Sequence, residues 1–215
     1  MRKAPVSRRD RPAKPPLSRD GVIAVALRIL REEGLEKVTM RRVAGELDTG
    51  PASLYVYVAN MAELHGALLD ELLSDLSDIS GQWREGVIDL LGQYHEILDK
   101  YPGLARSVLV LRPAGPRYIR LIDTLLGLLH EGGVPPAQAA WGVDLLLQMA
   151  TASAAEHGGD EQSDQGQIEA VRDADPADYP NVGRVKEELF AGTGMERRRW
   201  ALTALLEGIA ATPVA

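Results

Sequence analysis

Apolar residues recur along the chain at the spacing of amphipathic helices, and they nowhere alternate with polar residues long enough to predict a strand. The first ordered segment begins after Ser18, a favourable N-cap, and ends at Gly34, a favourable stop. Its apolar residues follow the i, i+3, i+4, i+7 rule of one helical face: Ile23, Ala26, Leu27 and Leu30. The pattern predicts an all-α protein.

Two short helices joined by a tight turn are predicted next. Thr39 caps the first, which ends near Asp48. Gly50 and Pro51 open the second, because proline at the first helical position loses no hydrogen bond. The residues expected to face inward are Val43, Ala44, Leu47, Leu54 and Val58. This arrangement is a helix-turn-helix, whose second helix can enter the major groove of DNA.

The remaining apolar pattern predicts further helices. They are expected from Asn60 to about Leu76, from Trp83 to Leu98, from Pro102 to about Leu111, over 117–131, from Pro136 through Ala152 to His157, over Val185–Ala191 and over Met195–Ala211. The acidic segment 158–183 is rich in Gly, Asp and Pro and is expected to be a flexible or functional loop.

Charge is distributed unevenly along the 215 residues. Residues 1–60 contain 12 Lys and Arg against 7 Asp and Glu, whereas 61–215 contain 12 against 24. The Pro- and Arg-rich segment 1–16 is expected to be a disordered basic tail, and it supplies most of the excess of positive charge in residues 1–60. The basic portion is compatible with binding to phosphate, although a tail without a partner explains it as well.

Composition excludes several classes of protein. Cysteine is absent, so disulfides and cysteine-ligated zinc are excluded. The sequence has neither an apolar run long enough to span a membrane nor a secretory signal, and we expect a cytoplasmic protein. Four isolated histidines form no metal-binding or nucleophile motif, and glycine-rich phosphate loops are missing, so we expect no enzyme, cofactor or metal.

The outward residues of the second short helix suit contact with DNA. Ala52 and Ser53 are small enough for close approach to base edges, and the hydroxyls of Tyr55 and Tyr57 can donate to phosphate. Arg41 and the backbone N–H groups near the helix start can bind a further phosphate. An ordinary three-helix packing unit with two surface tyrosines fits these residues equally well.

Residues from about 17 to 76 closely resemble the N-terminal domain of TetR-family transcriptional regulators. The resemblance lies in "GLEKVTMRRVAGEL", "LYVYV" and "NMAEL". It implies a DNA-binding domain over 17–77 and a ligand-binding and dimerisation domain over 78–215. The DNA contacts that it implies are Thr39, Met40, Arg41, Ser53, Tyr55, Val56 and Tyr57.

Three positions depart from the pattern of the family. Asp48 replaces a glycine, which a turn tolerates, and Thr49 replaces a valine. Met61 replaces a lysine that contacts phosphate. The slope of log K for DNA binding against log salt should therefore decrease by the amount that corresponds to about one phosphate contact. The basic tail could compensate by reaching the minor groove, although a tail that takes no part is the simpler expectation.

The resemblance also implies a dimer with a small-molecule site in each C-terminal domain. The helices over Pro136–His157 and Met195–Ala211 could pair with those of a second copy. The candidate ligand-binding residues are polar or aromatic residues on apolar faces: Trp83, Tyr94, Arg106, Thr124, Trp141 and Gln148. Val108 aligns with the metal-associated histidine of tetracycline repressors, so we expect a mostly apolar effector without a metal.

These features predict a dimeric repressor that a small effector releases from a palindromic DNA operator. The effector would act by favouring one position of the fourth helix over another. An activator with the same fold stays possible, since the position of the operator decides the sign. A helical carrier or interaction module that has lost operator binding is the alternative from another class.

Overall fold

The computed structural model describes residues 16–79, 81–111, 113–157 and 161–214, and it contains helices and no strand in these ranges. The chain divides into two compact units, of which the first ends at Met61 and the second begins at Ala62. The all-α prediction is therefore confirmed. Of the predicted basic tail, only Pro16 lies within the described residues.

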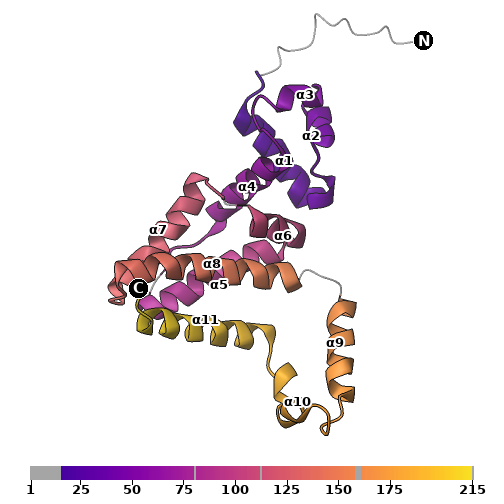
Figure 1. Cartoon of the computed structure of the whole chain (residues 1–215). Helices are drawn as coiled ribbons and strands as arrows, with labels where there is room; N and C mark the ends of the chain where they lie inside the picture. Colours follow the sequence, from indigo (N-terminus) through magenta and orange to yellow (C-terminus); the bar gives the residue numbers. More distant parts are fainter. Residues whose placement is uncertain (1–15, 80, 112, 158–160, 215) are drawn as a thin grey trace, which may run out of the picture. The chain divides into compact units, whose positions relative to one another are not determined.

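The first unit contains α1 (Arg19–Glu33), the 3-10 turn η2 (Leu35–Lys37), α2 (Met40–Glu46) and α3 (Pro51–Leu54) (Figure 1). Both predicted caps are present, because Ser18 Oγ accepts from Gly21 N at 3.1 Å and Thr39 Oγ1 accepts from Arg42 N at 3.1 Å. The core of the unit is apolar and comes from all three helices and the segments beside them: Val22, Ile23, Ala26, Ile29, Leu30, Val38, Met40, Val43, Ala44, Leu54 and Val58.

The turn between α2 and α3 is a Schellman motif centred on Asp48. Thr49 N donates to Ala44 O at 2.9 Å, and Asp48 N donates to Gly45 O at 3.1 Å. Asp48 has φ of 49°, in the left-handed region that glycine usually occupies at this position. The expectation that a turn accommodates this residue is confirmed, because the short side chain of Asp tolerates that conformation better than most.

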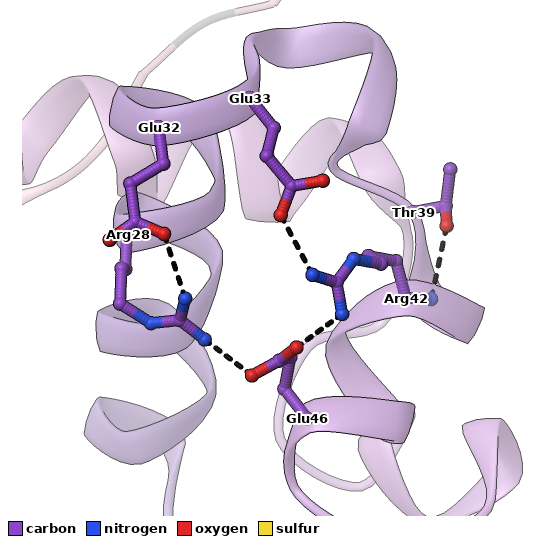
Figure 2. Close-up of polar contacts among 6 residues, drawn as sticks. All are labelled: Arg28, Glu32, Glu33, Thr39, Arg42 and Glu46. Atoms are coloured by element: carbon purple, nitrogen blue, oxygen red, sulfur yellow. Dashed lines mark hydrogen bonds and ion pairs between the residues drawn. The ribbon is translucent and has the colours of Figure 1, made fainter.

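A network of ion pairs joins α1 to α2 on the surface of the first unit (Figure 2). Glu46 lies between Arg28 and Arg42 and binds both guanidinium groups. Arg28 also binds Glu32 at 2.9 Å, and Arg42 also binds Glu33 at 2.7 Å. These hydrogen bonds, that from Arg42 foremost, lower the pKa of Glu46. Each exposed pair contributes little by itself, but together they orient α2.

The core of the second unit comes mainly from six helices, of which α6, α7 and α11 pack around α5 and α8. The six helices are α4 (Met61–Leu72), α5 (Trp83–Asp99), α6 (Pro102–Val110), α7 (Pro116–Glu131), α8 (Pro136–His157) and α11 (Gly194–Ala211) (Figure 1). A short turn, η3 (Leu73–Asp75), follows α4. Helix α8 contacts α5, α6, α7 and α11, which makes it the central element of this unit. Within the described residues, no helix is both long and apolar enough to cross a membrane.

The segment after α8 differs from its prediction as a loop. It contains α9 (Glu161–Asp173) and the short α10 (Pro180–Arg184). The large apolar residues of α9 are Ile168 and Val171, and both are half-buried. Two such residues are too few to show the apolar period of a helix in the sequence. The helix predicted over Val185–Ala191 is wrong as well, because only the 3-10 turn η4 (Glu188–Phe190) forms there.

The left-handed Asp48 predicts how substitutions at this position affect stability. Asp48→Ala should be less stable than Asp48→Gly by about 1 kcal/mol, because only glycine adopts this φ without steric cost. Both variants remove the same side-chain interactions, so their difference isolates the backbone term. Urea denaturation followed by circular dichroism measures it, and equal midpoints would contradict a left-handed residue 48.

Candidate DNA-binding surface and ligand cavity

The residues predicted to contact DNA gather at α3 and the turn that follows it. Ser53, Tyr55 and Val56 are exposed and Tyr57 is half-buried, whereas Leu54 is fully buried. The helical turn continues past α3, since Tyr57 N and Val58 N both donate to Leu54 O, at 2.9 and 3.0 Å. Val56 is 80% exposed, which is unusual for a large apolar side chain in an ordered turn.

The start of α2 presents a second part of this surface. Thr39 is exposed and caps the helix, and Arg41 is exposed on its first turn. Arg42 is held in the ion-pair network, whereas Arg41 makes no ion pair with any residue that the structure describes. Met40 is buried in the core of the first unit, so its side chain does not join the other six predicted residues at the surface.

A cavity of about 470 Å³ lies among α6, α7 and α8 in the second unit. Helices α6 and α7 and the segment between them contribute mainly aliphatic side chains, and α8 contributes the polar ones. The lining residues are Val108, Leu109, Leu111, Pro113, Tyr118, Ile122, Leu126, Ala140, Val143, Asp144, Leu147, Gln148 and Thr151. Volume and composition are those of a small-molecule site.

Only one of the six predicted ligand-binding residues, Gln148, lines this cavity. Arg106 is exposed on α6, and Thr124 donates a hydrogen bond to Arg120 O of its own helix at 2.9 Å. Trp83 packs close to the backbone of Gly132 at the far end of α7. Trp141 is 69% exposed and belongs to a groove between α8 and α11. The apolar pattern of a helix shows which polar residues lie on its apolar face, but it does not show which neighbouring helix each of them contacts.

Tyr94 lies behind the cavity wall and contacts it through Thr151. The two hydroxyl oxygens are 2.9 Å apart, and Thr151 Oγ1 donates to Leu147 O at 2.7 Å. Because a threonine hydroxyl has one proton, Tyr94 is the donor in the first bond. Burial raises the pKa of Tyr94, so its hydroxyl keeps this proton. Tyr94 thereby fixes the orientation of a lining residue without reaching the cavity.

A buried carboxylate of α4 caps the N-terminus of α7. Asp70 is 6% exposed, and its Oδ1 accepts hydrogen bonds from the backbone N–H groups of Arg117 and Tyr118, both at 2.9 Å. The residue at the N-cap position of α7 is Gly115, which offers no side chain. Asp70 therefore supplies from another helix the acceptor that a local cap normally provides.

Gly115 is needed for this contact, because a Cβ atom there would lie 2.1 Å from Asp70 Cγ. The Arg117 guanidinium adds an ion pair with Glu71 at 2.8 Å. A second polar link joins α4 to α6, where His65 Nδ1 lies 2.8 Å from Ser107 Oγ, and burial lowers the pKa of His65. Two walls of the cavity are thus attached to α4 by hydrogen bonds.

Comparison with known protein families agrees with this geometry. Residues 22–68 match the bacterial regulatory proteins of the tetR family. Residues 77–212 match the tetracyclin repressor-like C-terminal domain, which is more than half of the chain. The chain belongs to the TetR family.

Several TetR-family proteins are similar over much of the chain. The repressor DrrR1 of Streptomyces coeruleorubidus is 35% identical over 134 residues, which are 59% of this chain and 48% of DrrR1. The chain spans about half the length of the first curated relatives that it matches. These relatives are transcriptional regulators, in agreement with the expectation that the chain is not an enzyme.

Solved TetR-family structures extend the similarity to nearly the whole chain. SCO7704 of Streptomyces coelicolor, a candidate transcription regulator, is 50% identical with a TM-score of 0.86, covering 94% of this chain and 98% of that protein. ActR of the same organism, in complex with actinorhodin, is 29% identical with a TM-score of 0.77, covering 91% of this chain and 96% of ActR.

Sequence reasoning missed several residues that build the site. Asp70 stands among leucines on the inner face of α4, and an acid at such a position is a detectable signal for a buried cap. Its partner Gly115 lies 45 positions away, and nothing local links the two. Tyr118, Asp144 and Thr151 carry no motif, and only the packing of α6, α7 and α8 identifies them as lining residues.

Replacing glycine by alanine should have opposite effects on stability at Gly115, before α7, and at Gly127, within it. Gly115→Ala should destabilise the protein by about 2 kcal/mol, because the methyl group displaces Asp70 and leaves two N–H groups unpaired. Gly127→Ala, in open space within α7, should stabilise by about 0.5 to 1 kcal/mol through helix propensity. Guanidinium denaturation measures both, and an unchanged Gly115→Ala would refute the cap.

Proposed function

We propose that this chain is a homodimeric, cytoplasmic transcriptional repressor that binds a palindromic operator and leaves it when a small, mostly apolar effector binds. The observation that carries the proposal is the exposed surface at the start of α2 and at α3, on a helix-turn-helix with a complete Schellman turn. We assign DNA binding to residues 17–77, and effector binding and dimerisation to residues 78–215.

The proposed operator contacts are of two kinds: contacts with phosphates, which position the protein on the DNA, and contacts with base edges, which recognise the sequence. Arg41 and the N–H groups beside Thr39 would bind phosphate, which sets register without reading sequence. The hydroxyls of Tyr55 and Tyr57 would donate to further phosphates. Ser53 and Val56 would face base edges, and the methyl groups of Val56 suit the methyl group of thymine. The repressor activity of the relative DrrR1 supports the same role for this chain.

The proposed dimer would form through α8 and α11. Their shared groove presents Trp141, which is 69% exposed, and Leu145, which is 43% exposed. Trp200 and Met195 on α11 are more than 70% exposed. Four exposed large apolar residues on two helices favour pairing with the same helices of a second copy in a four-helix interface. A two-fold axis would then place two recognition helices about 34 Å apart, one turn of DNA.

The proposed coupling runs through α4. This helix follows the helix-turn-helix directly along the chain, and it holds α6 through His65 and α7 through Asp70. A ligand that displaces Tyr118 or Val108 would shift the ends of these hydrogen bonds and thereby bias α4. The complex of ActR with actinorhodin supports a small-molecule effector for this chain.

Operator binding is tested with DNA from upstream of the gene by fluorescence anisotropy over a salt series, against scrambled DNA. We expect tight binding to the native sequence alone. Arg41→Ala should weaken binding and reduce the slope of log K against log salt by about one phosphate per protomer. Arg120→Ala removes the same charge from the exposed face of α7 and should leave the slope unchanged.

Two results of that titration would count against the proposal. Equal, weak binding of wild type to both DNAs would favour a carrier or interaction module that lacks operator recognition. Equal slopes for wild type and Arg41→Ala would remove this residue from the phosphate contacts.

Dimerisation is tested by light scattering after size-exclusion chromatography. Trp141→Glu should shift the protein from dimer to monomer at micromolar concentration, because the interface would bury an unpaired charge. Ile119→Glu places the same charge at a residue of α7 that is 57% exposed and lies outside the groove, and this variant should stay dimeric. A monomeric wild type, or a dimeric Trp141→Glu, would disprove this interface.

A further inference from the structure

The polar groups of the cavity form a stripe along α8. Asp144, Gln148 and Thr151 are spaced i, i+4, i+7 and therefore lie on one face of the helix. The opposite walls are apolar apart from Tyr118, whose backbone N–H group is already bound to Asp70. A ligand in this cavity would meet hydrocarbon on one side and a line of polar groups on the other, namely the carboxylate of Asp144, the amide of Gln148 and the hydroxyl of Thr151.

Thr151 can only accept a hydrogen bond from a ligand. Its single proton goes to Leu147 O at 2.7 Å, and it receives the proton of Tyr94, whose oxygen lies 2.9 Å away. One lone pair of Oγ1 is then left for the cavity. A ligand carbonyl or carboxylate oxygen placed there would face another acceptor, whereas a ligand hydroxyl or ammonium would find a partner.

Asp144 gives the stripe its charge. Its carboxylate is an acceptor, and it forms no hydrogen bond or ion pair with any residue that the structure describes. No Lys, Arg or His is among the described residues that line the cavity. The wall of α8 therefore combines one negative charge with the oriented acceptor of Thr151.

We infer that the cavity selects an amphipathic ligand whose apolar body packs on α6 and α7 and whose hydroxyl or ammonium donors face Asp144 and Thr151 on α8. Compounds with such an apolar body that carry a hydroxyl or an ammonium group should bind better than carboxylates of the same shape. The inference rests on the proposed function, because it takes this cavity as the effector site, and it names the chemical class of that effector.

The test uses three fluorescent probes that share one ring system and differ in charge. They are 9-(aminomethyl)anthracene as the cation, 9-anthracenemethanol as the neutral donor and anthracene-9-carboxylate as the anion. Dissociation constants come from fluorescence titration of the full chain at low salt. Since a partly exposed ion contact is screened by solvent, the cation should bind about 5- to 10-fold more tightly than the anion.

Two acid-to-amide variants separate a local contact from the overall charge. Asp144→Asn should reduce the preference for the cation to about 2-fold or less. Asp123→Asn removes the same charge from an exposed residue of α7 that does not line the cavity, and it should keep the wild-type preference. Raising the salt concentration should weaken the preference in wild type and Asp123→Asn.

Three results would overturn the inference. The carboxylate binds wild type as tightly as the ammonium probe, the two variants behave alike, or none of the probes binds. Operator binding of the same preparations is measured by anisotropy in parallel. Retained operator binding together with any of these results rejects the ligand class alone, whereas loss of specific operator binding in wild type rejects the proposed function.

Discussion

The contact between Asp70 and the N-terminus of α7 is the constraint on which the second unit depends. One buried carboxylate satisfies two backbone N–H groups of a helix that has only glycine at its own cap position. Because a charged acceptor holds those groups, α7 cannot move relative to α4 without breaking strong hydrogen bonds. This contact fixes the position of Tyr118, which lines one wall of the cavity.

The first unit combines a network of ion pairs between α1 and α2 with an exposed surface at α3. Arg28 and Arg42 form ion pairs with glutamates of the other helix, and these pairs link α1 to α2 and orient α2 (Figure 2). Arg41 stays outside that network, and the Schellman turn at Asp48 leads into α3, whose Ala52 and Ser53 are exposed, as is Tyr55 directly after it. The ion pairs and the exposed surface thus both lie within residues 28–57.

Features that depend on neighbouring residues were predictable from the sequence, and features that depend on packing were not. The caps at Ser18 and Thr39 and the left-handed turn at Asp48 follow from side chains within a few positions. Arg106 and Trp141 do not line the cavity, because periodicity shows that a helix has an inner face but not which helix covers it. Helix α9 was missed because helix-forming polar residues carry almost no apolar period.

Hydroxyl-radical footprinting of DNA from upstream of the gene tests the central claim most directly, because it reports specific binding and two-fold symmetry together. The proposed regulator should protect two related patches whose centres lie about one helical turn apart. Addition of a mostly apolar effector that carries an ammonium or hydroxyl group should abolish both patches at once. A single asymmetric patch, or diffuse protection that any DNA sequence gives equally, would contradict a dimeric operator-binding repressor.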